Sequence, residues 1–441
     1  MTAPQVVLTS VLLTALAVQA LIPSHRILVI LCGAAVAALV ASLGGVATTA
    51  VLFARVPWDV ILILVGLGLL TEVLASTRVF GRLAVAFAVA SRARPRRLLL
   101  LFATGMYLVS GLVNNLTALL LVLPVLLRLL RLLGVDQRFA SWTLGALLVA
   151  CNLGGAATPI GDFPAILLLG GGRLAFGEYL VHAGPPTAAA LAAFLAITTF
   201  VVRPDRAADD DATVHRVALA VLRRLHRNVA IDRPLLIGAL VIECGLLAAW
   251  LLVPRASGIG PELICWLGAG VALLLRPRLG EALVRHRVDM EAVLYFLGLF
   301  VMVGAVQASG VLDEAARHLA AWDAPASVRL IAFLVAASLL TGLLSAGPSM
   351  AALLGVADGL AASYDPVVVY VGLALAVCAG SSLFLTAATS GPLAEMLTDR
   401  AELRDQRGAV VRFGFRQFLP VGLLGFSVIL ATALGYVMLV G

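Results

Sequence analysis

Lysine is absent from this chain, and charged residues of either sign are scarce. All 31 basic residues are arginine, and charged residues make up only 12% of the 441 positions. Soluble domains carry roughly 25% charged residues, so a water-soluble globular protein is excluded. Hydrophobic residues amount to 62%, and the mean hydropathy of +1.07 indicates an integral membrane protein.

Cysteine is also rare, and the motifs of membrane enzymes are missing. The five cysteines lie inside apolar segments without CxxC or Cys/His metal spacing, so we interpret them as packing residues. HExxH, a serine nucleophile with its base, and paired acids on a sizeable loop are all absent. These absences disfavour an enzyme and a cofactor. The pI near 9.6 does not indicate nucleic-acid binding, because the arginines fall in short loops where topology explains them.

About a dozen apolar runs are long enough to cross a bilayer. The first lacks the basic start and cleavage site of a signal peptide, so we expect it to be retained. Two runs are too long for one span and are expected to form hairpins, at 98–132 and 328–362. The runs lie at 5–22, 27–53, 58–75, 98–132, 141–170, 183–202, 235–253, 262–275, 290–308, 328–362, 366–397 and 417–440.

The arginines predict the orientation of each loop, because basic loops stay in the cytoplasm. Loops at 76–97, 203–234, 276–287 and 400–416 are rich in arginine, whereas the loops between them are not. The first hairpin therefore enters from the cytoplasm and the second from outside, with the N-terminus external. We expect a multi-pass protein of a bacterial inner (plasma) membrane.

Two stretches inside apolar sequence are unusually rich in Gly, Pro, Thr and Ser. They are Asn152-Leu-Gly-Gly-Ala-Ala-Thr-Pro-Ile-Gly-Asp-Phe-Pro-Ala and Cys378-Ala-Gly-Ser-Ser-Leu-Phe-Leu-Thr-Ala-Ala-Thr-Ser-Gly-Pro-Leu-Ala. Irregular backbone at membrane depth is tolerated only where it is buried in protein or lines a cavity. Paired breaks in two halves point to the binding site of a secondary transporter.

The two halves also match in register. At a shift of 232 residues the stretch from Arg55 aligns with that from Arg287, and the tip Asn114-Asn115-Leu116-Thr117 falls on Ala346-Gly347-Pro348-Ser349. At a shift of 228, Thr158 meets Thr386 and Asp162 meets Ser390. The sequence thus predicts an all-α polytopic membrane protein of two inverted-topology repeats. Each repeat has a re-entrant helical hairpin and a broken transmembrane helix.

With these repeats, the chain is predicted to divide into six parts. A connector at 203–234 separates the repeats; its Asp209-Asp210-Asp211 cluster is expected to be a solvated charge run and not a metal site. The parts are N-terminal helices 1–54, repeat 1 at 55–202 (hairpin 98–132, broken helix 141–170), the cytoplasmic connector 203–234, linking helices 235–286, repeat 2 at 287–399 (hairpin 328–362, broken helix 366–397) and the C-terminal helix 400–441.

The polar residues of the tips and breaks are the candidate ligands. Asn114 and Asn115 offer carbonyl oxygens to a cation and NH2 groups to an anion, or they satisfy open backbone at the tip. Asp162 is the one acid inside either break, and it can bind sodium, carry a proton or cap a half-helix. Ser390 is expected to cap the second half-helix. The remaining candidates supply hydroxyls or open backbone: Thr117, Thr158, Gly347, Ser349, Thr386, Ser381 and Ser382.

These motifs resemble the ion transporter superfamily, which includes arsenite exporters, the melanosomal P protein, D-type sodium/proton antiporters and dicarboxylate/citrate carriers. The resemblance covers nearly the whole chain and rests on Val113-Asn-Asn-Leu-Thr-Ala and on the 152–165 stretch. It implies elevator-type alternating access, commonly in a dimer, with ligand roles for Asn114, Asn115, Thr117, Thr158, Gly161 and Asp162. Phe163 replaces a usual proline, and Ala346-Gly347 stands where the family has Asn.

The leading hypothesis is a secondary active transporter that moves a small inorganic ion in exchange with protons or sodium. Asp162 would couple the exchange, and Na⁺ at Asn114, Asn115 and Asp162 is the metal that the pattern allows. An organic-anion (citrate or dicarboxylate) carrier is the alternative, although no arginine is predicted at membrane depth. The expected partners are the ion, the lipid bilayer and a second copy of the chain, with no nucleic acid.

Overall fold

The chain is helical throughout the part that the structure describes. The computed structural model describes residues 2–21, 25–204, 212–226, 230–253, 257–388 and 390–440. Within these ranges no strand forms, and one isolated bridge joins Arg404 to Val410. Nine of the described helices are long and apolar enough to cross a membrane, and shorter apolar helices accompany them. The prediction of an all-α, multi-pass membrane protein is confirmed.

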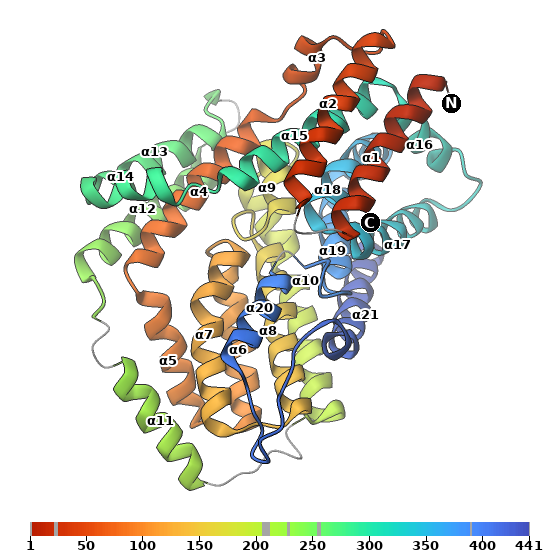
Figure 1. The fold of residues 1–441 in the computed structure, drawn as a ribbon. Helices are drawn as coiled ribbons and strands as arrows, with labels where there is room; N and C mark the ends of the chain where they lie inside the picture. Colours follow the sequence, from red (N-terminus) through yellow and green to blue (C-terminus); the bar gives the residue numbers. More distant parts are fainter. Residues whose placement is uncertain are drawn as a thin grey trace.

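The first half of the chain runs from the N-terminal helices through the first repeat to the connector. Figure 1 shows the hairpin α6–α7 and the helix α8 side by side in the lower half of the molecule. The helices are α1 (Ala3–Leu21), α2 (Arg26–Leu43), α3 (Thr49–Ala54), α4 (Trp58–Ser76), α5 (Val79–Ser91), α6 (Pro95–Ser110), α7 (Asn115–Leu133), α8 (Gln137–Ala157), α9 (Phe163–Gly170), α10 (Phe176–Ala196), the π-helical turn η2 (Ile197–Val202) and α11 (Ala212–His226).

The second half holds the linking helices and the second repeat. Its hairpin, α17–α18, lies higher and further to the right in Figure 1 than α6–α7. The helices are α12 (Arg233–Leu252), α13 (Pro261–Leu274), α14 (Pro277–His286), α15 (Met290–Ala308), α16 (Val311–Ala320), α17 (Ala326–Leu344), α18 (Ala346–Ala361), α19 (Pro366–Ser381), α20 (Gly391–Ala401) and α21 (Phe415–Val440).

The order of helices repeats as the register predicted. A shift of 232 residues carries α4 onto α15 from first residue to last, and carries the start of α5 onto the start of α16. A shift of 228 carries the first residue of α9 onto the first residue of α20. The last helix of each series also corresponds, since α10 packs on α8 and α21 packs on α19. The C-terminal helix α21 therefore occupies the place in the second series that α10 occupies in the first.

Helices α8 and α19 form the centre of the molecule. Both are apolar on all sides, as is typical of a helix that either protein or lipid surrounds. From Phe139 to Ala157 nearly every residue of α8 is buried, and α19 is buried from Val368 to Ser381. Each pairs with the outer arm of its own hairpin, α8 with α6 and α19 with α17. The two broken helices are thus the most enclosed part of the fold.

Three stretches expected to be loops are helical. The 76–97 stretch contains α5, 276–287 contains α14, and 309–327 contains α16. Each is rich in alanine, leucine, valine and arginine and packs an apolar side on the body of the protein, which stabilises a helix too short to persist alone. The connector was expected to contain an interfacial helix, and it holds α11, which buries Ala218 and Leu222. The Asp209–Asp211 cluster and Arg227 lie outside the described residues.

Candidate functional site

The tip of the first hairpin is bonded to the first break. The Asn115 backbone N–H donates to the Gly161 carbonyl at 3.2 Å. The Ser110 hydroxyl lies between the two elements, against Asn115 Oδ1 and 2.8 Å from the Cys151 carbonyl oxygen. Asn114 begins α7, and its Oδ1 accepts from the Leu116 N–H at 2.9 Å. The tip therefore has a fixed position on the break.

Glycine makes this close approach possible. A Cβ on Gly161 would lie 2.6 Å from Gly155 Cα and would also collide with the Ser110 carbonyl oxygen. A Cβ on Gly155 would occupy the place of the Asn115 carboxamide, 2.7 Å from its Nδ2. Contacts this short do not occur for real side chains, so the glycines of the 152–165 stretch are needed as space for Asn115 and not only as helix breakers.

Thr158 supports the same junction. It ends α8 in an extended conformation, and its hydroxyl donates to the Gly111 carbonyl at 2.6 Å. A helix that ends inside the protein leaves carbonyl and N–H groups without helical partners, and side chains must satisfy them. Thr158 satisfies one such carbonyl at the end of α6. Thr117, in the first turn of α7, is half-buried.

Asp162 is the first residue before α9 and is half-buried. Its Oδ1 accepts from the Phe163 N–H at 2.9 Å, so the predicted capping role is confirmed. Its second oxygen, Oδ2, accepts no hydrogen bond from any described residue. One oxygen of the carboxylate is thus engaged by the half-helix, and the other is free to bind a cation or a proton.

The tip of the second hairpin lies on the first break. A Cβ on Gly347 would lie 3.1 Å from the Phe296 ring and 3.4 Å from the Phe163 ring. These two rings stack with centroids 3.6 Å apart and an interplanar angle of 12°. Phe163 therefore connects α9 to α15 and to the second tip. Ser345 turns this tip with a φ of 88°, a strained conformation for a residue other than glycine.

The second break differs from the prediction in two respects. Ser390 was expected to cap α20, but this is wrong: its backbone is helical, and its side chain makes no capping bond. A serine side chain caps a helix N-terminus when its own backbone is extended, whereas the backbone of Ser390 is already helical. Thr386 is exposed, whereas the other nine predicted site residues are buried or half-buried.

Asn152 links the two breaks and was absent from the predicted ligands. Its Nδ2 donates to the Ser381 carbonyl at 3.2 Å and to the Ser382 hydroxyl at 3.1 Å. Ser381 and Ser382 are thus occupied in joining the ends of α8 and α19. Cys151, the neighbour of Asn152, lies beside Ser390 and close enough to Asp162 for an electrostatic interaction. The signal in the sequence was a carboxamide at the start of the break motif.

Three of the predicted residues carry a buried polar atom that has no partner among the described residues. These atoms are Asn115 Nδ2, Ser349 Oγ and Ser390 Oγ. The residues are 2%, 0% and 0% exposed. A buried polar group without a hydrogen bond costs about 1–3 kcal/mol, so such groups are rare. Similar atoms occur elsewhere in the described residues, for example Thr9 Oγ1 and Thr143 Oγ1, so these three are candidates for a ligand because two tips and one break each present one.

The other acids of the membrane region are engaged elsewhere or isolated. Asp358 accepts from Arg173 Nε at 2.7 Å and Nη2 at 2.8 Å, and from the Tyr370 hydroxyl at 2.8 Å. Glu243 is buried on α12, away from both breaks. Among the described residues no group of three or more His, Cys, Asp or Glu side chains is arranged to hold a resident metal.

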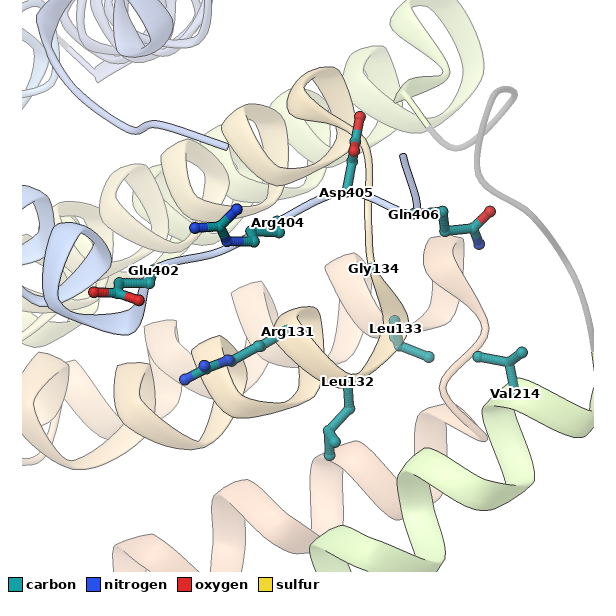
Figure 2. A pocket seen from close by; sticks show the side chains of 9 residues that line it. All are labelled: Arg131, Leu132, Leu133, Gly134, Val214, Glu402, Arg404, Asp405 and Gln406. Atoms are coloured by element: carbon teal, nitrogen blue, oxygen red, sulfur yellow. The ribbon is translucent and has the colours of Figure 1, made fainter. Parts of the chain in front are cut away.

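A polar pocket of about 500 Å³ lies at the far end of the first hairpin. Figure 2 shows Arg131 and Arg404 extending into it from α7 and from the 402–406 segment, with Glu402 beside them. Arg131 is sixteen residues beyond Asn115, roughly 24 Å along a helix. None of the predicted site residues lines this pocket, so it is separate from the tips and breaks.

Comparison with known proteins identifies related sequences over most of the chain. A family model described as citrate transporter (CitMHS) matches residues 13–380. An uncharacterised transporter of Mycobacterium tuberculosis (MT2759) is 34% identical over 60% of this chain, and the match spans 59% of that relative. The magnetosome protein MamN of Paramagnetospirillum magneticum is 29% identical over 92% of both chains.

Two further matches are weaker. Sodium/proton antiporter 1 of Arabidopsis thaliana is 27% identical over 60% of this chain and 44% of its own. The YdaH transporter of Alcanivorax borkumensis, a solved structure of unusual topology, shares 16% identity with a TM-score of 0.47, over 89% of this chain and 86% of that one.

Proposed function

Because the chain belongs to the CitMHS citrate transporter family, and is therefore a membrane transporter, we propose that it moves a small inorganic ion in exchange with protons or sodium. The observation that supports this most directly is the junction of tips and breaks. It combines three buried polar atoms without partners with a half-bonded carboxylate at the start of α9.

Asp162 is the coupling residue in this proposal. A carboxylate with one free oxygen can hold a sodium ion or a proton, but not both, and this competition is what links two opposite fluxes. The carbonyl oxygen and Oδ1 of Asn115 are already bonded within the protein, whereas its NH2 is not. The nearby hydroxyls of Ser349 and Ser390 can orient toward either a cation or an anion.

An organic anion carrier is the second candidate, and the unpartnered Asn115 NH2 favours it. This donor, two hydroxyls and the N-termini of α9 and α20 can bind carboxylates without arginine. Against it, Arg173 is held by Asp358, and an anion would meet the charge of Asp162.

Alternating access of the elevator type is part of the same proposal. In it the hairpins with α8, α9, α19 and α20 move as one body past α4 and α15. The Asn152 bonds between α8 and α19 support such a body. We also propose a homodimer in a bacterial inner membrane with the N-terminus outside, on the basis of the arginine distribution and the family resemblance.

Proton flux in inverted vesicles tests the proposal. We expect sodium or lithium to collapse an imposed pH gradient, and Asp162→Asn to abolish the response. Asp313→Asn, an exposed acid on α16, is the matched control and should respond as the wild type. If no cation acts and citrate does, the ion-exchange assignment is wrong and the chain is an organic anion carrier.

A further inference from the structure

The helices α13 and α14 enclose an apolar groove at the edge of the molecule, where Figure 1 shows them next to each other beside α4 and α12. Its volume is about 650 Å³. The walls include Trp266, Leu267, Val271 and Leu274 of α13 and Val284 of α14. All five side chains are strongly exposed, with Leu267 at 70% and Leu274 at 71%.

The corner between the two helices is rigid. Arg276 precedes the first residue of α14 and is held by Asp232 at 2.6 Å. A Cβ on Gly280 would lie 2.6 Å from the Leu273 carbonyl oxygen, so α14 is folded back tightly against the end of α13. Leu283, on the inner face of α14, is buried. The groove is therefore a built feature of the corner and does not depend on a flexible loop.

Charged side chains of α14 stand at one end of the groove, which Glu281 and Arg285 line. Arg278 and Arg285 lie two turns apart on the same stripe of α14 as Glu281, roughly 10 Å from each other. Arg285 approaches Glu281 only to 3.9 Å, with both side chains 73% exposed, and such a pair contributes little. Within the described ranges Arg278 has no ion pair or hydrogen bond. One guanidinium group, that of Arg285, therefore lines the apolar groove, and a second, that of Arg278, lies two turns before it on α14.

We propose that this groove binds an anionic phospholipid. Its acyl chain would lie along Trp266, Leu267 and Leu274, where an apolar surface inside a bilayer must be covered by hydrocarbon. Its phosphodiester would meet Arg278 and Arg285, since guanidinium groups bind phosphate oxygens by paired hydrogen bonds. A short basic amphipathic helix at the membrane surface is suited to anionic headgroups. This proposal is independent of the ion that the protein transports.

Mass spectrometry of the intact protein tests the charged end of the site. The protein is released from micelles containing equal phosphatidylglycerol and phosphatidylcholine. We expect the wild type to retain phosphatidylglycerol selectively, and the Arg278→Gln/Arg285→Gln variant to lose that preference about tenfold. Arg317→Gln, an exposed arginine on α16, should retain it.

Gly270→Leu tests the apolar end. No atom lies within 4 Å of a Cβ built on Gly270, so the new side chain fills the groove without disturbing α13, and we expect it to weaken retention of both lipids. Equal melting temperatures confirm that each variant is folded. Unchanged lipid retention in both variants overturns the proposal. The proposal is also overturned if the wild type forms a two-chain species that Gly270→Leu dissociates, because a second copy of the chain then occupies the groove.

Discussion

The two tip-and-break junctions have the same helices in the same order but differ in how they are bonded. In the first repeat, the side chains of Ser110 and Thr158 join the hairpin to α8 and the break, and the side chain of Asn114 caps α7. In the second, Ser345 turns the tip in a strained conformation, and the hydroxyls of Ser349 and Ser390 are buried without partners. Most polar groups of the first junction are bonded within the protein, with Asn115 Nδ2 left unpartnered, whereas both of these hydroxyls of the second junction are unpartnered among the described residues.

This difference assigns different tasks to the repeats. A site whose groups are mostly bonded already loses little entropy when a ligand arrives, so the first junction is suited to selecting the ion. The second junction has polar groups that gain hydrogen bonds only when the ligand is present. The second hairpin tip is therefore suited to closing on the site when the ion is bound. The experiments below test this division, beginning with the largest expected effect.

Gly161→Val should destroy the first junction. A branched side chain there collides with the Ser110 carbonyl and the Gly155 backbone, and overpacking of this kind costs about 1–3 kcal/mol or more. We expect loss of transport and a clearly lower melting temperature in detergent. Gly184→Val on α10, where a Cβ meets no atom within 4 Å, should change both far less. Wild-type transport by Gly161→Val would show that the tip does not need to touch the break.

Ser110→Ala should weaken the first junction without adding volume. The substitution removes a partner from Asn115 Oδ1 and from the Cys151 carbonyl, and unsatisfied buried acceptors cost about 1–3 kcal/mol each. We expect an apparent affinity for the ion reduced about tenfold, measured as the KM of uptake. Ser427→Ala, an exposed serine on α21, is the control. Equal KM values for the two variants would contradict a positioning role for Ser110.

Ser349→Ala and Ser390→Ala should separate binding from stability. Removing a buried hydroxyl that has no partner relieves its desolvation, so the free energy of unfolding should stay unchanged or rise by about 1 kcal/mol. If the ligand supplies the missing bonds, the KM should nevertheless rise several-fold. Uptake kinetics and thermal melting of the same preparations decide the matter. A rise in stability with an unaltered KM would leave these hydroxyls without a role in transport.

Arg173→Gln should have the smallest effect on binding. Arg173, after α9, joins the first repeat to Asp358 on α18 through two bonds, but the pair is partly exposed, at 24% and 38%. We expect a loss of up to about 1 kcal/mol in stability and an altered maximal rate with an unchanged KM. A large change in KM would instead place Arg173 in the binding site and strengthen the case for an organic anion.

The sequence predicted the architecture because its signals are local or periodic. Hydrophobic length identifies spanning helices, Gly and Pro mark the breaks, and the 232-residue register matched α4 to α15 with no structural information. The short helices α5, α14 and α16 were missed because their stability comes from packing on other elements, which periodicity does not report.

The site was predicted in outline and not in its bonding. Asp162 was expected to cap α9 and does so, because capping depends on the residue and its immediate neighbours. Ser390 looks equivalent in sequence but sits in a coiled turn, which residue type does not reveal. Asn152 was overlooked for a related reason: its partners, Ser381 and Ser382, are more than two hundred positions away, and nothing in a single sequence pairs them.

Asn152 also shows how the two halves differ where they meet. The 228-residue shift carries Asn152 onto Gly380, immediately before the two serines that it contacts. A residue that meets the neighbourhood of its own counterpart lies close to the rotation axis that relates the halves. Asn152 joins α8 to α19 at this axis, whereas Gly380 leaves room for the close approach of Ser338 and Thr341 on α17. The same register position therefore holds the two halves together in one repeat and packs a hairpin arm in the other.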